Sequence, residues 1–283
     1  MPDKPTTAVG YGPEFLERAR QTCLHVATVI GDMTDEIVLV GGLVPSLIVA
    51  QESLPSGAER HVGTMDVDVG LALGLLDEGR YQELSERLRR AGFGPDANEA
   101  GRKTRQRWVW RESRGVSVDF LIPPSAPADQ GGTIRDLEED FAALIAPGLP
   151  LAFRDRAKVT LDGETLLGER AVRDMWVCGP AAYLVLKALA FRSRGENKDA
   201  YDLFYVLRNH GDGPRTIAGS IRPLLDDSAA RDALGIIEAD FRTAGSVGAM
   251  RVAAFLGREG DATFLADVAG FARELVRLCG GER

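Results

Sequence analysis

A short segment in which apolar residues alternate with two aspartates strongly limits how this chain can fold. Residues 65–71 read MDVDVGL, and successive side chains of a β-strand point to opposite faces. Asp66 and Asp68 therefore share one face, and Val67 and Val69 face a core on the other side. Two carboxylates on one face repel each other unless a cation lies between them, and Mg²⁺ prefers one or two carboxylates together with phosphate oxygens. The alternative is two solvated acids on an amphipathic strand.

A pair of glycines ends another predicted strand upstream of this segment. The short apolar run at residues 36–40 stops at Gly41 and Gly42, and residues 43–50 read as a helix with a proline in its first turn. A glycine turn between a strand and a helix lets backbone N–H groups approach a phosphate closely. The alternative is a tight turn that binds nothing.

A third acid, Asp119, lies alone in the apolar alternating run VSVDFLI at residues 116–122. An acid in the middle of a strand needs a partner or a metal ion. A buried salt bridge or an edge position would meet that need as well. Three strand-borne acids near bound phosphates suit two-metal catalysis, in which one ion activates an attacking hydroxyl and the other holds a triphosphate.

The order of predicted elements indicates an α+β protein with two domains. Helices are expected at residues 14–30 and 77–91, a hairpin at 105–111 and 115–122, a loop at 123–132, and short strands near 151–159. From residue 179 onward the pattern is helical, at about 181–194, 197–209, 216–225, 229–244, 248–256 and 261–278. We place the domains at 1–175 and 176–283.

Composition excludes several classes of function. The 283 residues carry 34 basic and 42 acidic side chains, a net charge of −8. A protein that coats long duplex DNA is normally basic, so any contact with nucleic acid must be local. No apolar run approaches the ~18 residues of a membrane span, and the N-terminus lacks a signal peptide. We therefore expect a cytoplasmic protein with no membrane partner. The three cysteines, Cys23, Cys178 and Cys279, are too scattered for a disulfide framework.

The one local basic stretch is RKTRQRWVWRESR at residues 102–114. Basic residues with interleaved aromatic residues suit single-stranded nucleic acid, by phosphate contact and base stacking. The alternative is a solvated hairpin whose tryptophans pack on the core. The candidate nucleic-acid contacts are Arg102, Lys103, Arg105 and Arg107.

The pattern of Gly41-Gly42, Asp66-x-Asp68 and then Asp119 resembles the DNA polymerase β-type nucleotidyltransferase superfamily. A second motif, YLVLKALAFRSRGENKDAYDL at residues 183–203, is similar to a segment of the AbiEii/MenT group of bacterial toxins. That segment has a helical lysine, an arginine shortly after it, and then Lys-Asp with Tyr-Asp-Leu. The resemblance covers roughly residues 35–210.

This resemblance implies a polymerase β-type core followed by a helical domain that contributes lysine and aspartate to the active site. It implies a toxin that transfers NMP from an NTP to an acceptor hydroxyl, most readily the 3′ end of tRNA, which blocks translation. A cognate antitoxin and two Mg²⁺ ions are implied as well. The implied catalytic residues are Asp66, Asp68, Asp119, Lys187 and Asp199, of which the first three bind metal. The implied nucleotide-binding residues are Gly41, Gly42, Thr64, Arg192, Lys198 and Asp202.

Other interpretations remain open from the sequence. Lys198 and Asp202 could be an exposed i,i+4 pair. Thr64 could contact the triphosphate, accept a phosphate from an antitoxin kinase, or only cap its own backbone. The acceptor could be a small molecule or a protein. The chain could also be a non-catalytic module that binds nucleotide and docks a partner.

Overall fold

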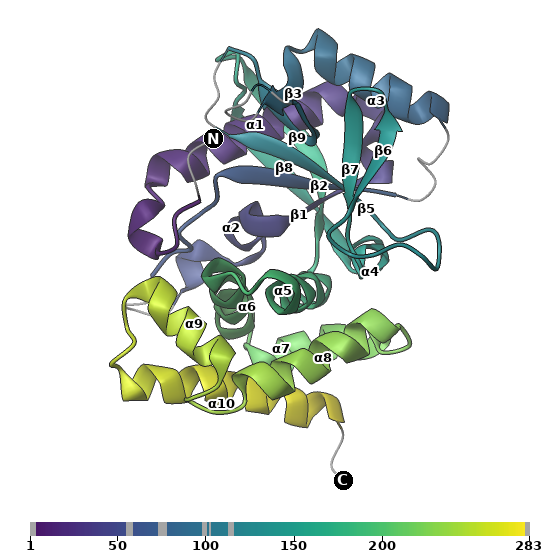
Figure 1. Cartoon of the computed structure of the whole chain (residues 1–283). Coiled ribbons are helices and arrows are strands. Elements are labelled where there is room, and N and C mark those ends of the chain that lie inside the picture. The colour runs from purple at the N-terminus through teal and green to yellow at the C-terminus, as the bar shows by residue number, and fades with distance from the viewer. Residues whose placement is uncertain are drawn as a thin grey trace. The chain divides into compact units, whose positions relative to one another are not determined.

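The computed structural model describes residues 4–54, 59–72, 78–97, 101, 103–112 and 116–280. The chain divides into two compact units. Unit 1 comprises Met1–Lys4, Gly12–Val44 and Gly63–Cys178, and unit 2 comprises Pro5–Tyr11, Pro45–Val62 and Gly179–Arg283. Unit 1 holds the sheet and unit 2 is helical (Figure 1). The predicted α+β class is confirmed.

Unit 1 is built on a sheet that, within the described residues, has nine strands in the order β3-β4-β5-β2-β1-β9-β8, with β7 pairing to β5 and β6. The central strand β2 runs antiparallel to β1 and parallel to β5. The strands are β1 (Ile37–Val40), β2 (Asp66–Leu71), β3 (Phe93–Ala97), β4 (Lys103–Trp110), β5 (Ser117–Ile122), β6 (Ile134–Glu138), β7 (Phe141–Ile145), β8 (Arg156–Glu164) and β9 (Arg170–Cys178). The two predicted central strands and the predicted β4–β5 hairpin are confirmed.

Two helices, α1 (Pro13–Ile30) and α3 (Glu78–Arg90), pack on one face of this sheet (Figure 1). Helix α1 begins with a proline in its first turn and buries Ala19, Cys23, Val26 and Ile30, which share a face by helical spacing. Both helices agree with the sequence prediction. Asp77, the first residue of the second predicted helix, lies outside the described residues.

One sequence prediction is wrong, and another is right only in part. The predicted helix at residues 43–50 is only one turn of α-helix, α2 (Pro45–Ile48), after a 3-10 turn at Gly41–Leu43. The β-branched residues of this run lower its helix propensity. Of residues 151–159, predicted as short strands, 151–154 lie in helix α4 (Leu149–Arg154), whereas 156–159 belong to strand β8 as predicted. A glycine with positive φ and a proline in the first turn start that helix, which outweighs the apolar character of the run.

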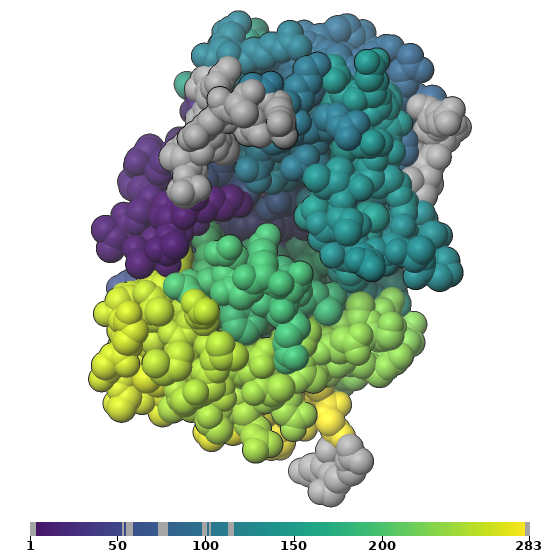
Figure 2. Space-filling view, in the orientation of Figure 1, coloured from purple at the N-terminus to yellow at the C-terminus, as the bar shows by residue number. Residues whose placement is uncertain are grey.

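Unit 2 contains the long helices predicted after residue 179. They are α5 (Pro180–Arg194), α6 (Asn197–Asn209), α7 (Pro214–Ile221), α8 (Ser228–Phe241), α9 (Val247–Leu256) and α10 (Ala262–Gly280). Helix α5 packs against α6, α7 and α8, and is buried on most of its circumference. The C-terminal helices form a continuous packed surface, green to yellow in Figure 2. Among the described helices, none is both long and apolar enough to cross a membrane.

Candidate metal centre

Strands β2 and β5 bring the three strand-borne acids of the sequence motif together. Asp68 lies directly beside Asp119 in the parallel register of these strands, and Asp66 shares the face of Asp68. One carboxylate oxygen from each of the three lies within 4.8 Å of the others. An all-oxygen donor set at this separation matches what Mg²⁺ takes in proteins. The three carboxylates can therefore hold a divalent cation.

The glycine turn after β1 runs closely past this group. Val40 pairs with Asp68 across the antiparallel register, and the next residue, Gly41, has a φ of +76°. A Cβ added at Gly41 would lie 1.8 Å from Oδ2 of Asp68. Only glycine permits both the left-handed backbone and this approach. Gly42 follows in the same turn and is buried.

Substitution of Gly41 by alanine should therefore damage both the fold and the carboxylate group. The left-handed conformation alone costs about 1–2 kcal/mol for a residue with a Cβ. Gly168→Ala is a matched control, because Gly168 has a φ of +75° and nothing within 4 Å of its added Cβ. In urea unfolding, we expect Gly41→Ala to lose more stability than Gly168→Ala, and to lose Mn²⁺ affinity as well. Equal effects of the two variants would contradict the close contact with Asp68.

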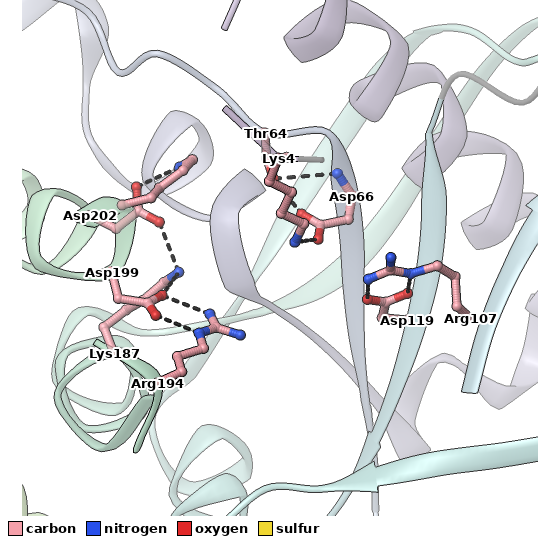
Figure 3. A network of polar contacts seen from close by, with 10 residues as sticks. Lys4, Thr64, Asp66, Arg107, Asp119, Lys187, Arg194, Asp199 and Asp202 are labelled. Atoms are coloured by element: carbon pink, nitrogen blue, oxygen red, sulfur yellow. Dashed lines mark hydrogen bonds and ion pairs between the residues drawn. The ribbon is translucent and has the colours of Figure 1, made fainter. Parts of the chain in front are cut away.

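Arg107 holds Asp119 with two parallel hydrogen bonds (Figure 3). Arg107 is the register partner of Asp119 on β4. Its Nε donates to Oδ1 at 2.7 Å and its Nη2 to Oδ2 at 2.6 Å. Burial raises the pKa of Asp119 and the nearby Asp66 charge adds to this, against the opposing effect of Arg107. Asp119 is thus both a member of the carboxylate group and one half of a salt bridge, two possibilities that the sequence leaves open.

Asp66 is held from two sides. Thr64 donates from Oγ1 to Oδ1 at 2.7 Å, and the Lys4 ammonium donates to Oδ2 (Figure 3). Burial opposes ionisation of Asp66, but Lys4, Thr64 and Arg107 together outweigh it and hold the pKa of Asp66 below its usual range. The Thr64 hydroxyl is buried and bonded to Asp66. No sequence pattern indicates Lys4, because it lies 62 residues from its partner.

Two other cations of the basic stretch are paired with acids. Lys103 contacts Asp140 at 2.7 Å, and Arg105 contacts Asp136 at 2.9 Å. Trp108 and Trp110 are 0% and 7% exposed and pack on the core, so neither ring is available for stacking on a base. This arrangement matches the alternative of a hairpin packed through its tryptophans. The fourth candidate of this stretch, Arg102, lies outside the described residues.

The second sequence motif forms a buried ion cluster in unit 2. The Lys187 ammonium lies 3.1 Å from Oδ1 of Asp199 and 2.8 Å from Oδ2 of Asp202. Lys198 contacts Oδ1 of Asp202 at 2.7 Å. Burial opposes the charge on Lys187, but the two aspartates outweigh it and raise the pKa of Lys187. Because the Asp202 side chain is 0% exposed, the alternative of an exposed i,i+4 pair is wrong.

The arginine of this cluster is not the predicted one. Arg194 donates from Nε and Nη2 to the two oxygens of Asp199, at 2.6 and 2.8 Å (Figure 3). Arg192, two residues earlier on α5, points elsewhere and pairs with Asp240 at 2.9 Å. Two residues on a helix differ by about 200° in direction, which explains why one arginine joins the cluster and the other does not.

His61 completes the cluster and is a residue that the sequence motifs do not indicate. Its Nε2 lies 2.8 Å from Oδ1 of Asp202, and its ring stacks on Tyr201 with centroids 5.3 Å apart. Complete burial lowers the pKa of His61 to about 4, and the charges of Lys198 and Lys187 add to this effect against the opposing effect of Asp202. The ring is therefore neutral at neutral pH.

This lowered pKa makes stability depend on pH. A histidine in the unfolded chain titrates near pH 6.5. Between about pH 6.5 and 4, the unfolded state therefore binds a proton that the folded state does not. Because of this difference, the stability of the fold decreases as the pH falls through that range. The shift corresponds to roughly 3 kcal/mol. Thermal and urea unfolding of His61→Gln should show a flatter pH dependence across this window than the wild type. Parallel curves for the two proteins would refute the assignment.

Comparison with known proteins adds no relative. No protein-family model matches the chain, and no curated protein matches it either. Each group must therefore be interpreted from its own geometry. One is the set of three carboxylates in unit 1, with Gly41, Thr64, Lys4 and Arg107 against them, and the other is the ion cluster within unit 2.

Proposed function

We propose that the chain is a metal-dependent nucleotidyltransferase of the AbiEii/MenT toxin type with a polymerase β-type core. The main support for this proposal is the carboxylate group of Asp66, Asp68 and Asp119, which lies beside a glycine turn. The glycines, the paired acids and the third acid are the residues of the sequence motif. Their convergence on one face of a mixed sheet supports the proposal, because the motif residues are far apart along the chain.

The donor set fits Mg²⁺, since three carboxylates offer the oxygen ligands that this ion prefers. When bound there, Mg²⁺ would neutralise phosphate charge and lower the pKa of an attacking hydroxyl. Asp66, Asp68 and Asp119 would hold the metal. Arg107 would keep Asp119 in place, and Thr64 would do so for Asp66. The Gly41 turn would leave room for a phosphate beside the carboxylates.

The proposed reaction transfers NMP from an NTP. The acceptor hydroxyl oxygen forms a bond to the α-phosphorus, and the bond from that phosphorus to the α–β bridging oxygen breaks. Pyrophosphate leaves with the electron pair of the broken bond, and the hydroxyl proton passes to solvent. Lys187, enclosed by Asp199 and Asp202, orients those two aspartates.

The proposed acceptor is the 3′ end of a tRNA, and the proposed control is a cognate antitoxin. Both come from the resemblance to the toxin group. The pairing of Lys103 and Arg105 with acids gives this part of the proposal no support from the basic stretch. The acceptor therefore needs its own test, separate from the test of nucleotidyl transfer.

The experiment incubates the purified protein with Mg²⁺, each α-labelled NTP in turn, and total tRNA. A matched sample of tRNA treated with periodate, which destroys the 3′ diol, is the acceptor control. We expect label on the intact tRNA with one preferred NTP and none on the treated tRNA. Label on protein or on a small molecule instead would keep nucleotidyl transfer and overturn the tRNA acceptor. Nucleotide binding with no pyrophosphate release and no label on any acceptor would overturn the proposal that the chain is an enzyme.

A further inference from the structure

The carboxylate group of unit 1 already has a cation against it. The ammonium of Lys4 contacts Oδ2 of Asp66 (Figure 3). Asp66, the acid that this ammonium contacts, is also one of the three acids that can hold a metal ion.

The two contacts to Asp66 differ in how easily they can be replaced. Thr64 is buried and is held on the same chain segment, two residues before Asp66. The Lys4 side chain is 50% exposed, whereas the Asp66 side chain is 8% exposed. Lys4 also lies in a stretch without helix or strand structure, so its withdrawal would break no backbone ladder. Of these two partners, only Lys4 can leave Asp66 at small cost.

A divalent cation and the ammonium would compete for one oxygen. Both are attracted to Oδ2 of Asp66, and two cations at one carboxylate oxygen repel each other strongly where water is partly excluded. The divalent ion carries twice the charge and gains direct coordination from several carboxylates. The divalent cation should therefore bind Asp66 more strongly than the ammonium does, but only after the ammonium has left.

We propose that Lys4 is a resident cation of this site, and that a divalent cation must displace its ammonium from Asp66 in order to bind. The inference rests on the proposed function for the presence of a metal, and it adds a residue that sets the metal affinity. Lys4 holds the Asp66 carboxylate in place while no metal is bound. The consequence is a weaker apparent affinity for the metal than the three carboxylates would otherwise have.

The first test is calorimetric titration of Mg²⁺ and Mn²⁺ into the wild type and Lys4→Met. We expect Lys4→Met to bind both ions about three- to tenfold more tightly, the factor expected from removal of a competing ion pair of about 1 kcal/mol. Lys158→Met is the matched control, because Lys158 lies over the ring of Trp176 and away from the acids. It should bind with wild-type affinity.

The second test follows the lysine itself. The chain has five lysines, Lys4, Lys103, Lys158, Lys187 and Lys198, so peptide mass spectrometry can follow the acetylation of each. We expect Mg²⁺ to speed acetylation of Lys4 by acetic anhydride and to leave Lys158 unchanged. Equal or weaker metal binding by Lys4→Met would overturn the proposal that the metal displaces Lys4, and so would a Lys4 acetylation rate that Mg²⁺ does not alter. Neither result would overturn the metal site. Absence of metal binding by both wild type and Lys4→Met overturns the cation site itself.

Discussion

Replacement of Asp68 by asparagine is expected to reduce kcat/KM for NMP transfer on the order of 10³-fold, because it removes a metal ligand whose charge acts on the transition state. Asp68 lies between the glycine turn and Asp119, with Gly41 against its Oδ2. Rates of pyrophosphate release, measured for the wild type and Asp68→Asn at the same Mg²⁺ concentration, give the comparison.

The control for this prediction is Asp96→Asn, which makes the same chemical change at a buried aspartate on β3, outside the carboxylate group. It should retain wild-type transfer. Asp68→Asn should also keep or gain stability without metal, since it relieves the repulsion between neighbouring carboxylates. If Asp68→Asn folded and retained the wild-type rate, Asp68 would not be a metal ligand. If Asp68→Asn lost stability without metal, repulsion between the carboxylates would not be the main effect of the Asp68 charge on stability.

Among the proposed variants, Asp202→Ala is expected to lower the free energy of unfolding the most. The Asp202 side chain is 0% exposed, and it contacts Lys187, Lys198 and His61. Asp202→Ala would leave the Lys187 ammonium short of one carboxylate inside the unit, and the loss of one partner of a buried ion pair costs about 3–5 kcal/mol. Urea unfolding monitored by circular dichroism would measure this loss.

Asp240→Ala is the control within the same unit. Asp240 pairs with Arg192, whose side chain is 52% exposed, and an exposed pair of this kind contributes about 1 kcal/mol or less. The double variant Lys187→Met/Asp202→Ala should lose less stability than the sum of the two single variants, because the second change removes the stranded charge. Additive losses would show that Asp202 does not stabilise through Lys187.

The sequence predicts the carboxylate face because it follows from local periodicity. Alternation in residues 65–71 and 116–122 requires Asp66 and Asp68 to share a face and puts Asp119 on a strand of its own. The helices predicted after residue 179 are confirmed, and two of them, α5 and α7, begin with a proline in the first turn. What periodicity does not give is strand order, so the neighbouring positions of Asp68 and Asp119 depend on the β2–β5 pairing.

The contacts missed by sequence reasoning are between residues far apart in the chain. Lys4 meets Asp66 and His61 meets Asp202 across 62 and 141 residues, and no local pattern encodes such pairs. Arg107 is a different case. It belongs to a stretch with a nucleic-acid signature, yet its register on β4 directs it to Asp119. Arg192 and Arg194 differ only in the direction in which each side chain leaves helix α5, and an exact helix boundary would have predicted that direction.

The proposal that Asp66, Asp68 and Asp119 form a nucleotidyl-transfer centre is tested most directly by the anomalous diffraction of crystals soaked with Mn²⁺ and a non-hydrolysable NTP analogue. We expect a Mn²⁺ peak coordinated by carboxylate oxygens of Asp66 and Asp68, with Asp119 beside it and the triphosphate on the open side of the ion. The Lys4 ammonium should no longer contact Asp66. A well-ordered triphosphate bound elsewhere, with no Mn²⁺ at these carboxylates, would contradict the claim that this group of acids is a nucleotidyl-transfer centre.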